Sequence, residues 1–221
     1  MILSFLSGDD LNYTCSKTNM INNRNIIIFI TALMVSETSF TQANKPAIDY
    51  LHVPGPIRFE NKSYDLSWTA HPAANFYKQE YLVKDDDAGK FHMMILMDVV
   101  TGETAIKNVV ATKVAELKKM KEGNPMINYE VVKDPESGEY MIDFLLTANA
   151  PDGSISIAER NVYRYKTFAD KTGHTGVLLF GISSRVYGSE VTPFFASLKS
   201  NRKDLMDKVA QVVVPAINIR N

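Results

Sequence analysis

One ten-residue segment limits the folds open to this chain more than any other. Residues 91–100 (FHMMILMDVV) alternate between two faces, and both faces are mostly apolar. One face carries Phe91, Met93, Ile95, Met97 and Val99, and the other carries His92, Met94, Leu96, Asp98 and Val100. A strand with two apolar faces needs cover on both sides. We therefore expect a central strand in a sheet that has packed layers above and below it.

The pattern around this segment predicts three strands, a helix, four strands and a final helix. Residues 103–121 carry apolar side chains at helical spacing, and a second helical region opens at Thr192. The other expected strands are residues 63–69, 76–83, 126–133, 139–149, 154–166 and 176–187. The expected fold class is α+β, with a largely antiparallel sheet of about seven strands and helices packed on it.

This order of elements, βββαββββα, resembles the PsbP/Mog1-like architecture. The resemblance covers roughly residues 57–217 and is carried by the order of the elements. It implies an antiparallel sheet with helices on its faces. It also implies an accessory or binding role, since members of that fold class serve mainly in such roles rather than as enzymes.

A second methionine precedes a segment with the pattern of an export signal. Met20 begins a short start that contains Arg24, an apolar run follows at residues 26–35, and a polar stretch ends at Ala43. We expect residues 20–43 to be a signal peptide that is cleaved after Ala43. The mature protein would then be periplasmic or secreted. The alternative is a cytoplasmic protein in which residues 26–35 form a buried strand.

The export hypothesis also divides the rest of the chain. Residues 1–19 would be an extension upstream of the true start, residues 44–56 an extended lead-in, and residues 57–217 a single globular domain. The sole cysteine, Cys15, would be absent from the mature chain, which excludes disulfides and thiolate chemistry. The apolar run is about half the length that a membrane span needs, so no span is expected.

Charge and motifs exclude several functional classes. The chain has 24 basic and 25 acidic residues, and this balance argues against a nucleic-acid partner. The four histidines are too widely spaced for a helix-borne metal pair. Residues 181–185 (GISSR) begin like a nucleophile elbow, but Arg185 replaces the second glycine. Residues 85–87 lack the ligand spacing of a calcium loop. We expect no metal, no cofactor and no catalytic residue.

A register argument gives the candidate binding residues. If Asn149 pairs with Ser154, Asp143 lies opposite Arg160, and if Lys133 pairs with Glu139, Tyr129 also faces Asp143. The row Tyr129, Asp143 and Arg160 would cross three neighbouring strands among apolar residues. A buried carboxylate needs a partner. We therefore expect an Asp143–Arg160 salt bridge, which either fixes the strand register or forms the polar floor of a ligand pocket.

A second patch is both polar and aromatic. Residues 76–81 (FYKQEY) and 163–166 (YRYK) combine tyrosine with charged side chains. Such residues are common in recognition surfaces, and they are equally common on sheet faces, where aromatic cross-strand pairs add stability. The patch predicts either a partner-binding surface or an ordinary sheet face.

The sequence as a whole favours an exported binding or accessory protein that performs no catalysis. Its partner would be a small molecule or another envelope protein. One alternative is a metal-independent hydrolase that uses carboxylates from separate strands, and a deep pocket holding two nearby acids with perturbed pKa values would favour it. A purely structural component of the envelope is the other alternative.

Overall fold

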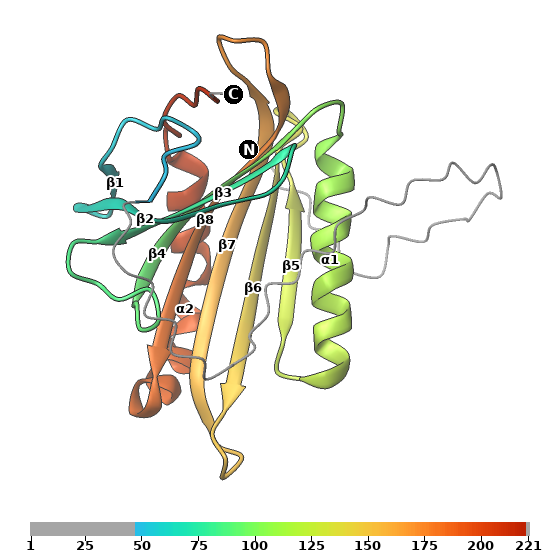
Figure 1. Ribbon diagram of the computed structural model, residues 1–221. Coiled ribbons are helices and arrows are strands. Elements are labelled where there is room, and N and C mark those ends of the chain that lie inside the picture. The colour runs from blue at the N-terminus through green and yellow to red at the C-terminus, as the bar shows by residue number, and fades with distance from the viewer. Residues whose placement is uncertain (1–46, 220–221) are drawn as a thin grey trace, which may run out of the picture.

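The sequence folds into one antiparallel sheet, as the short turn-linked strands predict. The computed structural model describes residues 47–219, within which eight strands and three helices are present (Figure 1). The strands are β1 (Ile57–Phe59), β2 (Lys62–Ala73), β3 (Phe76–Val83), β4 (Met93–Thr101), β5 (Asn128–Lys133), β6 (Tyr140–Asn149), β7 (Ile155–Ala169) and β8 (Thr175–Tyr187). The helices are α1 (Ile106–Gly123), the short 3-10 helix η1 (Gly188–Glu190) and α2 (Val191–Gln211).

The strands follow the spatial order β1-β2-β3-β4-β8-β7-β6-β5, and every neighbouring pair is antiparallel (Figure 1). Two meanders therefore meet at the pairing of β4 with β8. The doubly apolar segment at residues 91–100 supplies β4, and it lies in the interior of the sheet as expected. Nine residue pairs, from Met93–Ser184 to Thr101–Gly176, join the two meanders.

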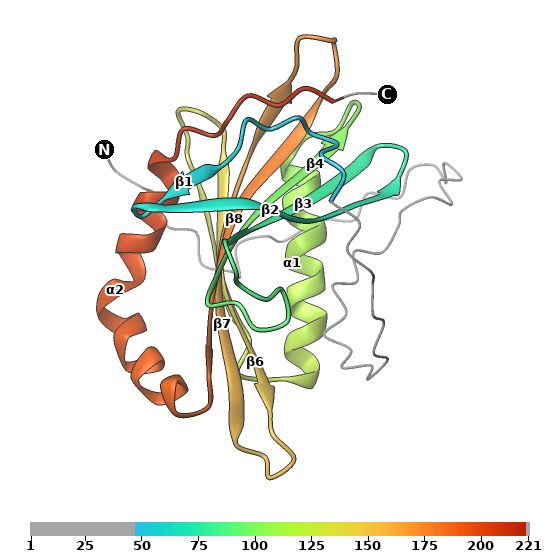
Figure 2. The same ribbon diagram turned by 60° about the vertical axis from the view of Figure 1, so that its left-hand side comes forward.

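The helices cover opposite faces of the sheet, which gives three layers (Figure 2). Helix α1 packs on β5, β6 and β7 through Val110, Val114 and Leu117, while α2 packs on β7 and β8. The two faces of β4 feed separate cores. Ile95, Met97 and Val99 belong to the α2 side, and Met94 and Leu96 belong to the α1 side.

The fold confirms the α+β class and corrects several details. Strand β1 adds one strand to the seven expected, and η1 precedes the last helix. The packed unit also reaches beyond residues 57–217. Leu51 and Val53, in the expected lead-in, and Ile219, near the C-terminus, are buried in the core on the α2 side. The backbone N–H of Asn218 donates to the carbonyl of Leu51 at 2.9 Å, so the two ends of this unit pair with each other.

Other sequence predictions fall outside this part of the chain. The expected signal peptide at residues 20–43 and the sole cysteine, Cys15, lie outside the described residues. Among the helices formed by residues 47–219, none is long and apolar enough to cross a membrane.

Candidate functional site

The predicted contact between Asp143 and Arg160 is present, although it arises from a different register. Asp143 lies opposite Val162, and Arg160 lies opposite Leu145. Relative to the expected pairing the register moves by two positions, which keeps both side chains on one face. Arg160 Nε donates to Asp143 Oδ1 at 3.0 Å, and a second guanidinium nitrogen donates to Oδ2 at 3.3 Å. Only 2% of Asp143 and 5% of Arg160 are exposed.

Two local features move the register. The β6–β7 turn closes with the N–H of Ala150 donating to the carbonyl of Ser154 at 2.8 Å, which accounts for one position. An irregularity between Ala148 and Asn149 adds the other. A bulge of this kind inserts one extra residue on one strand.

The predicted contact of Tyr129 with Asp143 is wrong. Lys133 pairs with Tyr140 instead of Glu139, so Tyr129 lies opposite Phe144. A shift of one residue turns a side chain to the other face of a sheet. Tyr129 therefore packs with the apolar cluster beneath α1, and Glu130 takes the position opposite Asp143.

Helix α2 supplies a fourth member of this cluster. Arg202 donates to Asp143 Oδ2 at 2.7 Å and contacts Glu130 at 2.9 Å, while Arg160 donates to the backbone carbonyl of Arg202 at 2.5 Å. Two acids and two arginines thus satisfy one another beside a cavity of about 410 Å³. The geometry anchors α2 to the sheet, and a binding role for Asp143 and Arg160 stays a prediction.

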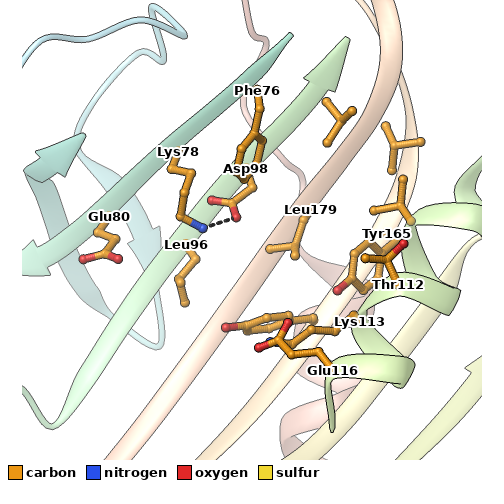
Figure 3. Close-up of a pocket in the computed structure, with 14 residues that line it drawn as sticks. Phe76, Lys78, Glu80, Leu96, Asp98, Thr112, Lys113, Glu116, Tyr165 and Leu179 are labelled. Atoms are coloured by element: carbon orange, nitrogen blue, oxygen red, sulfur yellow. Dashed lines mark hydrogen bonds and ion pairs between the residues drawn. The ribbon is translucent and has the colours of Figure 1, made fainter. Parts of the chain in front are cut away.

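A different pocket lies on the opposite face, between α1 and strands β3, β4, β8 and β7 (Figure 3). Its cavity volume is about 70 Å³. The apolar lining residues are Phe76, Leu96, Val100, Val109, Val177 and Leu179. The polar lining residues are Lys78, Glu80, Asp98, Thr112, Lys113, Glu116, Tyr163 and Tyr165. The cavity combines aliphatic and aromatic carbon with polar groups, as small-molecule sites do, and it is smaller than their usual volume of about 300–1,000 Å³.

Strand register brings these side chains together. Lys78 lies opposite Asp98, Asp98 opposite Leu179, and Leu179 opposite Tyr165, so one row crosses four strands. The next row contains Glu80, Leu96, Gly181 and Tyr163. A Cβ atom at Gly181 would lie 2.8 Å from the ring of Tyr163. Glycine at that position therefore lets the Tyr163 ring lie close to the sheet floor.

Asp98 is the most unusual group in the pocket. Only 8% of the residue is exposed, and Lys78 Nζ contacts its Oδ2 at 2.5 Å, as the dashed line in Figure 3 shows. Its other oxygen, Oδ1, is buried and has no hydrogen-bond partner within residues 47–219. Burial raises the pKa of Asp98, and the charge of Lys78 opposes this increase only in part. A buried acceptor without a partner costs stability.

The neighbouring titratable groups share this environment. Burial also raises the pKa of Glu80, and the nearby Asp98 carboxylate adds to that effect while Lys78 opposes it. Burial raises the pKa values of Tyr163 and Tyr165 well above the ordinary value, so both phenols are neutral near pH 7. They can therefore donate a hydrogen bond.

Helix α1 contributes charge to the opposite wall (Figure 3). Lys113 Nζ contacts Glu116 Oε1 at 3.1 Å and lies 5.8 Å from the centre of the Tyr163 ring. A lysine over an aromatic ring gains cation–π attraction. The wall formed by α1 is thus held by its own ion pair, and it faces the Lys78–Asp98 pair across the pocket.

Two of the histidines lie beside acidic side chains. Within the described residues, no group of three or more histidine, cysteine, aspartate or glutamate side chains could hold a metal ion. His92 is exposed and lies 3.7 Å from Glu190. His174 contacts Asp170 at 3.0 Å in the β7–β8 turn. Asp170 in turn accepts a hydrogen bond from the N–H of Ile219 at 3.1 Å, so this pair holds the C-terminal tail.

Sequence reasoning missed the Lys78–Asp98 pair, although both residues belong to segments that it singled out. Alternate members of the polar and aromatic patch, Phe76, Lys78 and Glu80 on β3 and Tyr163 and Tyr165 on β7, line the pocket. The missed signal is Asp98 itself, a lone acid in a strand with two apolar faces. Such an acid needs a partner on an adjacent strand.

The described chain is an α+β protein with an antiparallel sheet between helical layers. A protein-family model matches residues 51–214, and the chain belongs to that family, whose function is unknown. The match includes every strand of the sheet and both long helices. No curated protein and no solved structure matches the chain.

The cluster around Asp143 predicts a large stability effect. Replacing Arg160 with methionine removes two hydrogen bonds from a buried carboxylate, and we expect the free energy of unfolding to fall by about 3 kcal/mol. Urea denaturation followed by circular dichroism measures this loss. Lys203→Gln is the control, because Lys203 forms an exposed pair with Asp207 on the same helix. An unchanged urea midpoint in Arg160→Met would refute the anchoring role.

The raised pKa of Asp98 predicts a pH effect with a defined sign. The folded protein binds the Asp98 proton more tightly than the unfolded chain does. Asp98 therefore lowers the free energy of unfolding least when the pH is below its unfolded pKa of about 4. Wild-type stability relative to Asp98→Asn should therefore decrease as pH rises, by at most about 1.4 kcal/mol per pH unit. Urea denaturation of both proteins between pH 4 and 8 tests this. A difference that stays constant or grows contradicts the raised pKa.

Proposed function

We propose that this protein is an exported, non-catalytic binding protein that holds a small neutral molecule in the pocket beneath α1. The observation that carries the proposal is the buried Oδ1 of Asp98, an acceptor with no partner among the described residues, in a side chain that lines the cavity. A ligand that donates one hydrogen bond to this oxygen would remove the cost of leaving it unpaired.

The size of the cavity limits the part of the ligand that enters it. One bound water needs about 10–15 Å³ of cavity volume. The 70 Å³ cavity is therefore large enough for roughly five waters, or for one small ring. The aromatic and aliphatic lining favours a planar, apolar ring over a strongly hydrated group.

The charges favour a neutral donor over a cation. Lys78 already contacts the other oxygen of Asp98, so a second cation at Oδ1 would lie close to the lysine ammonium. The raised pKa of Asp98 also weakens its preference for a charged partner. An amide N–H or a hydroxyl group satisfies the oxygen without adding charge.

A hydrolase is the second candidate, because two carboxyl groups with raised pKa values line one pocket. Glu80 and Asp98 lie on adjacent strands and interact electrostatically. Such pairs occur where one acid donates a proton and the other accepts one. The ion pair with Lys78 favours binding instead, since it engages one Asp98 oxygen directly. Release of p-nitrophenol from a panel of esters and glycosides, lost in Glu80→Gln, would favour the hydrolase.

The compartment and the class are part of the same proposal. Residues 20–43 have the pattern of an export signal, and the balanced charge fits a soluble accessory protein of the envelope. The antiparallel sheet between helices is compatible with the PsbP/Mog1-like architecture that the order of elements suggested. Members of that class act mainly by binding. A purely structural role in the envelope would leave the pocket without a ligand.

Benzamide tests the pocket because it combines one ring with an amide donor. We expect a dissociation constant near 1 mM, which is typical of so small a ligand. Acetophenone has a similar shape but no donor, and it should bind at least about tenfold more weakly, because a hydrogen bond to a carboxylate is lost. Ligand-observed NMR or isothermal titration calorimetry measures both affinities.

A double variant supplies the control for this experiment. Lys78→Met with Asp98→Leu replaces the ion pair with apolar side chains of similar size, a change that often preserves stability. This variant should bind benzamide and acetophenone equally. The Lys203→Gln protein should behave as wild type. If the wild-type protein also fails to distinguish the two compounds, Asp98 is not the group that selects the ligand.

Export makes a separate prediction. The protein recovered from outside the cytoplasm should begin at Asn44, because the expected cleavage follows Ala43. N-terminal sequencing or intact mass measures the first residue. Recovery of the protein with Met1 in place would contradict both the cleavage and the later start at Met20.

A further inference from the structure

We infer that Trp68, which lies next to the lining residue Glu80, extends the α1 pocket outward, and that the natural ligand carries a second flat ring, which stacks on this side chain. The inference rests on the proposed binding function and assigns the specificity of that same site. Trp68 is the only tryptophan of the chain, and 39% of it is exposed.

The face that Trp68 occupies is set by a bulge in β2. Leu66 lies opposite Tyr81 on β3, whereas Trp68 lies opposite Glu80, so one extra residue is inserted between them. Without this shift, strict alternation would place Trp68 on the same face as Tyr64 and Leu66, which belong to the α2 side. The bulge turns Trp68 to the face of Glu80, which lines the pocket. Bulges often redirect a side chain next to a functional site.

The position of Trp68 continues the floor of the pocket. The row that contains Tyr163, Gly181, Leu96 and Glu80 passes next to Trp68 on β2. Directly opposite residues in an antiparallel pair have Cβ atoms about 5 Å apart. The Trp68 and Glu80 side chains therefore leave the sheet next to each other. A partly exposed tryptophan offers a large flat surface at a low cost in conformational entropy, as binding sites often require.

The distance from Asp98 to Trp68 defines the shape of the ligand. The two residues are two strands apart across the sheet and two positions apart along it. Standard strand spacing and rise place their backbones roughly 12 Å apart. A ligand with one ring in the cavity and a donor at Asp98 therefore needs a short linker before its second ring reaches Trp68. Both ends are apolar and the middle is polar, which describes a neutral diaryl amide or a related compound.

A series of benzamides with a second ring tests this shape. The probes are benzamide itself and its N-benzyl, N-(2-phenylethyl) and N-(3-phenylpropyl) derivatives, each titrated into the wild-type protein. We expect a roughly three- to tenfold gain in affinity at the linker length that reaches Trp68, as an aromatic pair provides. The same titration should change the fluorescence of Trp68, which reports directly on contact because no other tryptophan contributes.

Variants separate the stacking role from a structural one. Trp68→Ala should remove the gain of the extended probes and leave the affinity for benzamide within twofold of wild type. Trp68→Phe should retain part of the gain. Met126→Ala, a similarly exposed apolar residue next to β5 at the opposite end of the sheet from β2, is the matched control and should change neither.

The outcomes distinguish the two proposals. If benzamide binds and selects against acetophenone, but the extended probes gain nothing over benzamide, the role of Trp68 is wrong and the binding function stands. An equal loss for benzamide and the extended probes in Trp68→Ala also overturns the inference, because the indole would then act only on the structure of the pocket. If none of the compounds binds the wild-type protein, both proposals fail.

Discussion

The structure depends on the burial of β4 and β8 on both faces. These two strands join the two meanders, and neither face of β4 has enough polar side chains to lie in water. Burial of apolar surface contributes about 25 cal/mol per Å², so cover on each face is strongly favoured. The chain supplies that cover with two helices on opposite sides. Helix α1, however, packs on β5, β6 and β7. The pocket lies beside the helix, over β8, β4 and β3, which α1 does not cover completely.

Patterns with a short period were sufficient to predict the elements, because they depend on each residue and its near neighbours. The central strand, the helix at residues 103–121 and the hairpins all follow from local alternation and turn residues. Strand β1 was not predicted, because its three residues are too few to show an alternation of apolar and polar side chains. Leu51 and Ile219 are buried through contacts between the two ends of the described chain, and no local pattern reports contacts of that range.

Register was the main limit for the candidate site. The predicted register of β6 and β7 was wrong by two positions, an even number that leaves Arg160 on the same face of the sheet. The contact with Asp143 was therefore predicted correctly, although the two residues are not directly opposite each other. The error between β5 and β6 was one position, and it placed Tyr129 on the wrong face. A single residue at a turn decides between these results. The bulge at Trp68 has the same effect, because the alternation of Tyr64, Leu66 and Trp68 places all three on one face until an extra residue intervenes.

Two of the buried ion pairs of the sheet, Arg160 with Asp143 and Lys78 with Asp98, differ in how their carboxylate oxygens are used. Asp143 uses both oxygens, with Arg160 and Arg202 as donors, and the second arginine brings in α2. The contacts of Arg202 with Asp143 and Arg160 thus connect α2 to the sheet. Asp98 uses one oxygen, and the other is buried without a partner among the described residues, in a side chain that lines the pocket beside α1. An unpaired buried acceptor adds nothing to the stability of the described fold. This difference is why we propose recognition at Asp98 and mechanical support at Asp143.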